Sequence, residues 1–392
     1  GNYSRTPNSE KKILFLLDND YAPDIRVKKE IKSLIKEGFY IQLFCWDINC
    51  KLPKSESFSN LSIERIQTPS KKQLGYKQLF YLLKFYFQLL LNIKRKKIEF
   101  DIIHVHDFRL LPLAVIIKLI YKKPLIYDAH EIYIFMEAEK FNKHILKIIG
   151  KLESLLIKVF VNEFITVSQQ RVNEYWEKKI PNLKYTIIGN WHNKVDQLSK
   201  KENLLIRNKL KIKEGIKVIG YIGSISPSRN ITSFCEFLRK NKDYVGVIAG
   251  SGNQQQEEIL NKYAIENENI KFLGYIDNPY KIYNMCDALI YLIKEDHSYA
   301  NWIAPNNLYI AIACTKPLIS LNTGEVKQIF SKKNIGYCLN DYSYNELLKA
   351  TNYLLKDNRE AKIKDNILSI QHLYTWDKAE EELLIVYKRI FR

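Results

Sequence analysis

Two successive series of apolar, strand-like runs alternate with amphipathic segments along the 392-residue chain, and this alternation constrains the fold most strongly. Uninterrupted apolar runs are typical of strands buried on both faces, as in a parallel sheet covered by helices. The first series comprises Lys12–Asp18, Tyr40–Asp47, Asp101–Asp107, Pro124–His130 and Glu163–Ser168. The second series comprises Lys217–Ser224, Val245–Gly252, Ile270–Ile276, Ala288–Ile293 and Pro317–Leu321.

A polar, charged stretch that begins at His192 separates the two series. We therefore predict an α/β protein with two doubly wound domains, the first over residues 1–195 and the second over residues 196–375. Ligands of doubly wound sheets bind beyond the carboxyl ends of the strands. The expected binding site thus lies in the cleft between the two domains.

The composition excludes several classes of protein. With 46% hydrophobic and 27% charged residues, the chain is globular rather than disordered. No uncharged apolar run reaches the length of about 18 residues that a membrane span needs, and the polar N-terminus lacks a signal segment, so we expect a cytoplasmic protein. The six cysteines form no CxxC pair, which is typical of reduced thiols and not of a disulfide framework or zinc site.

The formal charge of +18 requires an explanation. Nucleic acid, an anionic membrane surface and phosphorylated substrates are the candidate partners. The lysines are spread along the chain and form no recognisable nucleic-acid module, so we expect no nucleic acid partner. Residues 76–97 and 143–160 combine apolar faces with lysines, as helices that lie on the inner face of the plasma membrane do. Buried helices flanked by solvated lysines are the alternative reading of both segments.

Two strand ends of the second series carry residues suited to a phosphorylated ligand. Gly223 ends one run, and a glycine there lets the backbone approach a ligand. Arg229, a few residues later, could neutralise a diphosphate, although an incidental arginine in a surface loop is the alternative. Gly250 and Gly252 end another run, but no third glycine completes a dinucleotide-binding fingerprint.

Histidines gather at the strand ends of the first series. His104 and His106 alternate with apolar residues, which predicts that both face one side of their strand. His130 directly follows another strand-like run and precedes Glu131. A histidine in this position can bind a substrate hydroxyl or transfer a proton. We expect no metal site, because no group of metal-binding residues has ligand spacing in the second domain, and the acidic stretch Asp18–Asp20 follows the first strand as a loop.

Eight segments, in order along nearly the whole chain, resemble glycosyltransferase family 4 enzymes of the GT-B fold, which act in bacterial polysaccharide assembly. They are DNDYAPDIRVKKEIKSL, DIIHVHD, LIYDAHE, ITVS, GYIGSISPSRN, FLGYI, APNNLYIAIACTKPLIS and TWDKAEEELLIVYKRI. The resemblance implies two Rossmann-like domains facing across a cleft, with a C-terminal helix over residues 376–392 that packs back on the first domain.

The same resemblance implies an activity. It is the transfer of a hexose, with retention of configuration, from a nucleotide-diphosphate sugar to a glycan or lipid-linked acceptor. The resemblance implies neither a metal nor a cofactor, and it favours UDP over GDP as the nucleotide. It does not distinguish the sugar, the acceptor or the linkage.

The resemblance also implies roles for individual residues. His130 contacts the transferring sugar and Arg229 supplies a cation for the diphosphate. The residues implied to bind the donor are Gly223, Ser224, Tyr275, Ile276, Glu295, Pro305, Asn306, Asn307 and Leu308. The residues implied to lie on the acceptor side are Asp20, Asp24, Arg26, His106 and Glu131.

Three positions depart from the family pattern. Asn307 stands where a lysine is common, Ile310 where a glutamate normally holds the ribose, and Thr315 where a glycine is usual. Loss of the carboxylate–ribose contact costs about 1.5–3 kcal/mol of affinity. Either Glu295 supplies this contact, or the donor sits differently, or activity is weak.

Two rival functions share this fold. One is a nucleotide-sugar 2-epimerase, which needs more acid/base residues than the second half of the chain offers. The other is a non-catalytic GT-B partner subunit that has lost donor binding, a reading that Ile310 and Ser224 favour, since the family has a cation at the latter position.

Overall fold

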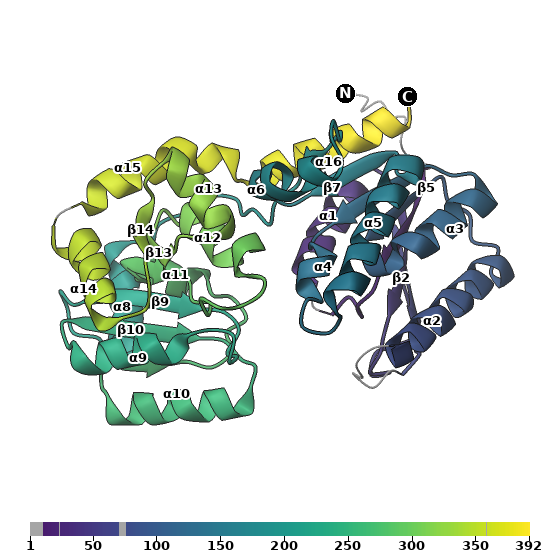
Figure 1. Ribbon diagram of the computed structural model, residues 1–392. Coiled ribbons are helices and arrows are strands. Elements are labelled where there is room, and N and C mark those ends of the chain that lie inside the picture. The colour runs from purple at the N-terminus through teal and green to yellow at the C-terminus, as the bar shows by residue number, and fades with distance from the viewer. Residues whose placement is uncertain (1–10, 23, 70–75, 358) are drawn as a thin grey trace. The chain divides into compact units, whose positions relative to one another are not determined.

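A computed structural model describes residues 11–22, 24–69, 76–357 and 359–392. The first ten residues, to which the expectation about a signal segment applies, lie outside this range. The chain forms two compact units (Figure 1): residues 1–188 together with 380–392, and residues 189–379. The functional domain assignment with limits at 195 and 375 stays a prediction.

The first unit is built on an eight-stranded sheet with the order β3-β4-β2-β1-β5-β6-β7-β8. Its strands are β1 (Lys12–Leu17), β2 (Tyr40–Trp46), β3 (Ser55–Phe58), β4 (Leu61–Ile66), β5 (Ile102–His106), β6 (Leu125–Ala129), β7 (Glu163–Thr166) and β8 (Thr186–Ile187). β3 pairs with β4 antiparallel, and the other strand pairs are parallel. β1 lies between β2 and β5, so the chain order reverses at this point of the sheet.

Helices connect the strands of the first unit. They are α1 (Ile25–Lys36), α2 (Tyr76–Arg95), α3 (Leu111–Tyr121), α4 (Tyr133–Met136), α5 (Lys143–Phe160), α6 (Gln169–Arg171) and α7 (Glu177–Lys179), with the short turns η1 (Phe108–Leu110) and η2 (Val172–Trp176). The last helix, α16 (Trp376–Ile390), belongs to this unit from Glu380 onward. It is anchored there, because the hydroxyl of Ser33 donates to the carboxylate of Glu380 at 2.5 Å.

The second unit has a six-stranded, parallel sheet with the order β11-β10-β9-β12-β13-β14. Its strands are β9 (Lys217–Ile222), β10 (Tyr244–Ala249), β11 (Ile270–Phe272), β12 (Ala288–Ile290), β13 (Leu318–Leu321) and β14 (Gly336–Leu339). Its helices are α8 (Lys200–Lys209), α9 (Ile231–Lys240), α10 (Gln254–Glu266), α11 (Tyr280–Met285), α12 (Asn306–Ala313), α13 (Gly324–Lys332), α14 (Tyr344–Thr351) and α15 (Glu360–Ile370), with the turns η3 (Ala300–Trp302), η4 (Asn352–Lys356) and η5 (Gln371–Leu373).

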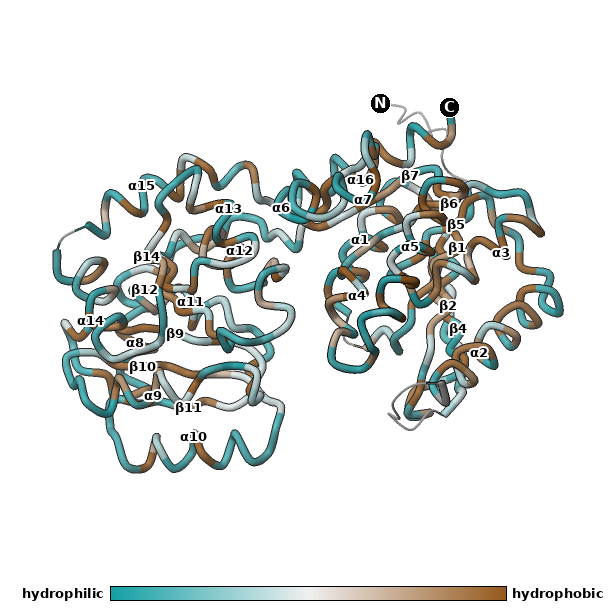
Figure 2. The backbone as a smooth tube through the Cα atoms, viewed as in Figure 1, coloured by the Kyte–Doolittle hydropathy of each residue, from teal (hydrophilic) through white to brown (hydrophobic). Residues whose placement is uncertain are grey.

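The core of each unit follows its central strands, which Figure 2 shows as hydrophobic segments. In β1, all residues from Ile13 to Leu17 are at most 1% exposed. Such complete burial requires helices on both faces of the sheet and explains why these strands read as continuous apolar runs. The predicted fold class, α/β with two doubly wound parallel-sheet domains, is confirmed.

Several strand boundaries differ from the prediction. The run Ile270–Ile276 forms a strand only as far as Phe272, because Gly274 takes a positive φ of 67° that bends the backbone away. A search for long apolar runs does not predict β3, β8 and β14, which are short, or β4, in which polar and apolar residues alternate. Within the described residues, no helix is long and apolar enough to span a membrane.

Candidate functional site

The carboxyl edge of the first sheet gathers polar residues from three strands. Asp18 follows β1, His106 ends β5 and is followed by Asp107, and His130 follows β6. The chain order reverses between β1 and β5, so the loops after these strands diverge. Doubly wound folds bind ligands at such a point.

Helix α1 brings two charged side chains to this edge. The helix begins after Asp24, whose carboxylate accepts a hydrogen bond from the backbone N–H of Val27 at 3.0 Å. Arg26 and Glu30 follow, four residues apart and therefore on one face of the helix. Both are buried, with exposures of 9% and 0%.

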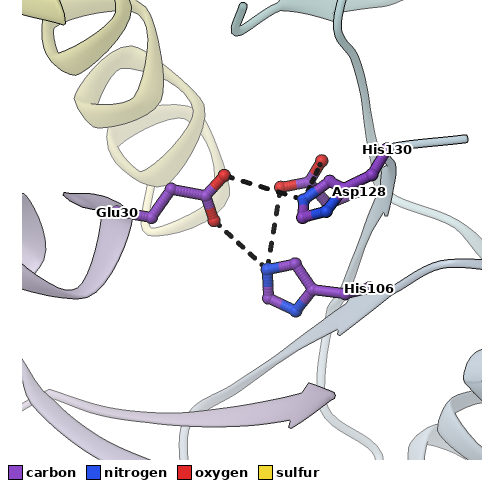
Figure 3. A group of neighbouring side chains, drawn as sticks. All are labelled: Glu30, His106, Asp128 and His130. Carbon is purple, nitrogen blue, oxygen red and sulfur yellow. Dashed lines mark hydrogen bonds and ion pairs between the residues drawn. The ribbon is translucent and has the colours of Figure 1, made fainter. Parts of the chain in front are cut away.

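Four side chains, Glu30, His106, Asp128 and His130, form what we call the histidine–carboxylate cluster (Figure 3). Nε2 of His106 lies 3.2 Å from Oε2 of Glu30. Nε2 of His130 lies 3.2 Å from Oδ1 of Asp128. One nitrogen or oxygen atom from each residue falls within 4.8 Å of the other three.

Arg26 supplies positive charge to this cluster. Its Nε lies 3.2 Å from Oε1 of Glu30, and its Nη2 lies 3.2 Å from Oδ1 of Asp128. Burial alone would raise the pKa of Asp128, but His130 and Arg26 hold it well below its usual range. Burial also lowers the pKa of His130 to about 4. At neutral pH an aspartate anion therefore faces an arginine cation beside an uncharged histidine.

The spacing of the cluster would suit a divalent metal ion, since two imidazoles and two carboxylates are a common ligand set. The guanidinium of Arg26, however, approaches both carboxyl groups and already supplies a positive charge beside them. The charge arrangement therefore favours a hydrogen-bonded network, and we assign no metal ligands among the described residues.

A second layer of hydrogen bonds holds the cluster in place. His104 contacts the hydroxyl of Tyr387 through Nδ1, at 2.7 Å, and Asp128 through Nε2, at 3.1 Å. The rings of His104 and His106 stack with centroids 4.6 Å apart, so both lie on one face of β5 as their alternation predicts. Tyr387 lies on α16, and the C-terminal helix thus supports the site directly.

The remaining residues expected on the acceptor side have local partners. Oδ1 of Asp20 accepts a hydrogen bond from the backbone N–H of Ala22. The backbone N–H of Glu131 donates to Asp107 at 3.1 Å, and its carboxylate lies 3.5 Å from Arg171. Of the five residues expected on the acceptor side, Arg26 and His106 lie in or against the cluster, and Asp24 begins the helix that carries Arg26.

Sequence reasoning missed two members of the cluster, Glu30 and Asp128. Both carry a signal that can be recognised afterwards. Glu30 follows Arg26 by four residues, which places the pair on one face of α1, and Asp128 lies near the end of β6, two residues before His130. Tyr387 has no such signal, because only the folded chain brings the C-terminal helix beside β5.

The carboxyl edge of the second sheet is built largely from backbone. The backbone N–H of Gly250 donates to the carbonyl of Gly274 at 2.8 Å. Gly250 has φ of +138°, and a Cβ there would lie 1.8 Å from the carbonyl oxygen of Gly223. Glycine is thus required at this position, and the loops after β9, β10 and β11 pack backbone against backbone.

The loop after β9 carries the predicted Ser224 and Arg229. Ser224 is exposed. Arg229 is half-buried, and its Nη1 donates to the hydroxyl of Tyr291 at 2.6 Å. The guanidinium also lies over the Tyr291 ring, 5.3 Å from its centroid. Tyr291 therefore fixes the direction of the Arg229 side chain.

Helix α12 begins at the predicted Pro-Asn-Asn turn. Pro305 precedes its first residue, Asn306, which is exposed at the helix N-terminus. The side-chain oxygen of Asn306 accepts a hydrogen bond from Nε2 of His192 at 2.6 Å, and Tyr280 contacts the other ring nitrogen at 3.1 Å. The predicted Asn307 and Leu308 are buried in the first turn, and sequence reasoning did not foresee His192 or Tyr280 beside them.

Two of the three departures from the family pattern have visible structural consequences. Ile310 is 3% exposed and belongs to the core. Thr315 ends the helix region with φ of +55°, a left-handed conformation that a β-branched residue rarely adopts. Its hydroxyl accepts a hydrogen bond from Gln371 at 3.1 Å, which helps to hold that conformation.

The other residues expected at the donor side follow strand ends. Tyr275 is 70% exposed and Ile276 half-buried, in the loop after β11. Glu295 is exposed, in the loop after β12. All of these loops leave the same edge of the sheet, because its strands are parallel.

Two doubly wound units with polar and glycine-rich carboxyl edges define a class of two-domain α/β proteins, in which ligands bind at the carboxyl ends of the strands. Comparison with known families narrows this class. Residues 26–193 match the model of Glycosyltransferase Family 4, and residues 202–367 match that of Glycosyl transferases group 1. The chain belongs to the family 4-like GT-B glycosyltransferases.

Solved structures share this fold along almost their full length. A sucrose-phosphate synthase from Thermosynechococcus elongatus superposes with a TM-score of 0.74 at 14% identity, over 97% of this chain and 99% of that one. HepE from Anabaena in complex with UDP gives 0.72 at 15% identity, over 96% and 100%. WaaG, a glycosyltransferase involved in lipopolysaccharide biosynthesis, gives 0.64 at 13% identity, over 94% and 98%. No curated protein matches the sequence significantly.

Proposed function

We propose that the protein transfers a hexose from a UDP-sugar to a glycan or lipid-linked acceptor, with retention of configuration, in the assembly of a bacterial surface glycan. Family membership supports the transferase activity. HepE structures that hold UDP and UDP-glucose support this choice of donor class. In this proposal the second unit binds the donor, and His130 contacts the transferred sugar.

The backbone edge of the second sheet is the observation that carries the proposal. Three loops meet there through backbone atoms, since Gly250 packs on Gly223 and bonds to Gly274. Such an edge lets a nucleotide lie close to backbone amides. The N-terminus of α12, at Asn306, adds amides and a positive dipole end, which bind the distal phosphate.

We further propose that charge on the departing diphosphate is stabilised without a metal. Arg229, oriented by Tyr291, supplies the cation, and the first turn of α12 supplies N–H donors. Adding EDTA to the transfer assay is expected to leave the rate unchanged. A rate that EDTA abolishes and Mn²⁺ restores would contradict metal independence.

A thermal-shift panel of nucleotide-sugars is the first test of the proposed activity. UDP-sugars are expected to raise the unfolding temperature, because a ligand that binds only the folded state stabilises it. Donor consumption is then measured with and without a glycan acceptor. Consumption that needs the acceptor supports transfer, whereas conversion of the donor alone identifies an epimerase.

Glu295 is our proposed substitute for the glutamate that Ile310 replaces. Ile310 is buried and apolar, whereas Glu295 is exposed after β12. Glu295→Gln is expected to raise the KM for the donor about tenfold or more, as a lost hydrogen bond to a charged group does. Glu258→Gln, an exposed site on α10, serves as the control. An unchanged donor KM in the Glu295 variant would exclude this role.

We also propose that the first unit docks on an anionic membrane surface. Helix α5 exposes an apolar stripe whose residues recur every three or four positions: Ile145, Ile148, Leu152, Leu155 and Val159. Ile148 and Leu155 are 66% and 56% exposed. These exposures support docking of this helix over the alternative of a buried helix flanked by solvated lysines.

Lysines and a neighbouring helix extend this surface. Lys143, Lys147, Lys151 and Lys158 are exposed on α5 and line a groove of about 800 Å³ along it. Helix α3 packs against α5 and exposes Leu119 and Ile120 to 59% and 60%. Apolar residues flanked by lysines suit a bilayer with anionic headgroups, where each lysine adds about 1 kcal/mol of binding.

Vesicle sedimentation tests this surface without any enzyme assay. The protein is expected to bind vesicles that contain phosphatidylglycerol and to bind less at high salt. Ile148→Glu combined with Leu155→Glu is expected to abolish binding, while Ile265→Glu, at an 85% exposed site on α10, is expected to leave it intact. Equal binding by wild type and the double variant would contradict the proposal.

A further inference from the structure

Within the histidine–carboxylate cluster, the contact between His106 and Glu30 determines where a proton lies. Nδ1 of His106 is 3.0 Å from the carbonyl oxygen of Leu16. A carbonyl oxygen only accepts hydrogen bonds, so Nδ1 carries the hydrogen. A neutral imidazole has one N–H, and Nε2 of His106 therefore presents a lone pair. That lone pair faces Oε2 of Glu30 at 3.2 Å.

Two lone-pair atoms at this distance repel unless a proton lies between them. Burial favours the arrangement with fewer charges, because charged groups lose hydration inside the protein. Burial and the neighbouring Asp128 raise the pKa of Glu30 well above its usual value, and burial lowers the pKa of His106. The proton therefore belongs to the carboxyl of Glu30, which donates to His106.

Asp128 occupies the opposite situation, because donors approach both of its oxygens. Nη2 of Arg26 lies 3.2 Å from Oδ1, and Nε2 of His104 lies 3.1 Å from Oδ2. His104 is itself oriented, since the hydroxyl of Tyr387 can donate to Nδ1 and leave the hydrogen on Nε2. Asp128 is thus the member of the carboxyl pair that stays ionised.

The ionised Asp128 in turn determines the tautomer of His130. Nε2 of His130 is buried, lies 3.2 Å from Oδ1 of Asp128 and makes no hydrogen bond of good geometry within the described residues. An N–H, not a lone pair, must face a carboxylate at this distance. Nδ1 of the uncharged ring is then the atom that accepts a hydrogen bond.

We infer that Glu30 is an uncharged carboxylic acid that donates a hydrogen bond to His106. Because Glu30 carries the proton, Asp128 stays ionised and holds His130 as the neutral Nε2–H tautomer. Glu30 is thus a positioning residue for His130. Nδ1 of His130 then accepts a hydrogen bond from a sugar hydroxyl. This last step rests on the proposed function, whereas the protonation state of Glu30 does not.

Every element packed around Glu30 contributes charged or titratable groups to this balance. They are Arg26 on α1, His104 and His106 on β5, Asp128 and His130 on and after β6, and Tyr387 on α16, with Asp24 and Asp107 acting from a greater distance. Arg26 and Asp128 compensate each other, so an uncharged Glu30 leaves this buried group without net charge.

Infrared difference spectroscopy of wild type against Glu30→Gln tests the protonation state directly. The wild type is expected to show the carbonyl stretch of a protonated carboxylic acid at pH 8, and Glu30→Gln to lack it. Burial also raises the pKa of Glu153 and, well above its usual range, that of Asp107, but both residues are common to the two proteins, so the difference spectrum isolates the band of Glu30. Absence of this difference band would overturn the inference. It would also be overturned if the wild type bound one equivalent of a metal ion and the Glu30→Gln variant did not.

Nitrogen NMR of the histidines and kinetics test the positioning role. The wild type and Glu30→Gln are expected to keep His130 as the neutral Nε2–H tautomer, because the glutamine amide can also donate to His106. Glu30→Ala is expected to lower kcat by about 10- to 100-fold, because Nε2 of His106 loses the carboxyl that faces it, and Glu30→Gln to recover most of that loss. Equal losses in the two variants, or a changed His130 tautomer in Glu30→Gln, would contradict the role. A protein with no transferase activity still answers the spectroscopic tests.

Discussion

The two units present their carboxyl edges by different physical means. The first edge is a buried network of side chains, in which Arg26, Asp128 and His130 balance one another's charge. The second is mainly backbone, where Gly250 lies against Gly223 and α12 begins nearby. A charged network can hold a proton or orient a histidine, whereas a backbone edge can follow the shape of a nucleotide and its phosphates. The proposed division of labour between sugar and nucleotide follows from this difference.

Among the substitutions considered, removal of the Asp128 charge is expected to destabilise the first unit most. Asp128→Asn is expected to lower the free energy of unfolding by about 3–5 kcal/mol, because the buried guanidinium of Arg26 loses the carboxylate that balances its charge. Denaturant unfolding measures the loss. Asp243→Asn is the matched control, since that carboxylate is exposed and pairs with Lys356 at the surface, where little change is expected. Similar losses in both variants would contradict a charge-balanced cluster.

Arg229 is the one predicted cation of the second edge. Arg229→Ala is expected to lower kcat about 100-fold, because it removes charge stabilisation from the departing diphosphate. The control variant is Arg239→Ala. Arg239 is an exposed residue of α9 that pairs with Glu236, and its substitution is expected to leave kcat unchanged. Steady-state kinetics compares the two variants. A kcat within a factor of about two of wild type in Arg229→Ala would exclude this role.

Low pH is expected to lower the folding stability of the first unit, because His130 becomes protonated. The folded pKa of His130, about 4, lies below its unfolded value of about 6.5, so the folded state resists its protonation. Its contribution is complete above pH 6.5 and is lost as the pH falls toward 4, with a total of roughly 3 kcal/mol. As the pH falls across this range, the free energy of unfolding is expected to decrease more steeply for the wild type than for His130→Gln. Parallel curves would show that His130 does not titrate in this way.

The smallest expected effect concerns the backbone edge. Gly250→Ala places a Cβ against the carbonyl of Gly223 and keeps a positive φ. Its cost is expected to exceed that of Gly215→Ala by about 1–3 kcal/mol, because Gly215 also has a positive φ but open space around it. Denaturant unfolding of the two variants separates crowding from backbone strain. Equal costs would show that the loops do not pack as closely as described.

The sequence predicted the central strands well, because burial on both faces leaves a continuous apolar signal. It did not predict β3 and β4, where polar and apolar residues alternate at the edge of the sheet. It also extended β11 to Ile276, since glycine within an apolar run does not reveal that Gly274 turns the chain. The end of a strand therefore depends on backbone conformation, which the hydrophobic pattern of the sequence does not reveal.

The candidate sites were predicted unevenly for a similar reason. His130 directly follows β6 and Arg229 lies in the loop after β9, so chain order alone places both residues at a carboxyl edge. Glu30 lies within a helix, and Tyr387 comes from the far end of the chain, so only folding brings them beside His106 and His104. A pattern search recognises residues at one edge of a sheet but not those that reach it from a packed helix.

Calorimetric titration with UDP tests the central claim, that the second unit binds the nucleotide of a sugar donor. Wild type and Arg239→Ala are expected to bind UDP with similar affinity, and Arg229→Ala to bind it at least about tenfold more weakly, as expected for the loss of a hydrogen bond between charged groups. Absence of heat with UDP and with GDP in all three proteins would contradict donor binding and indicate a non-catalytic partner subunit instead.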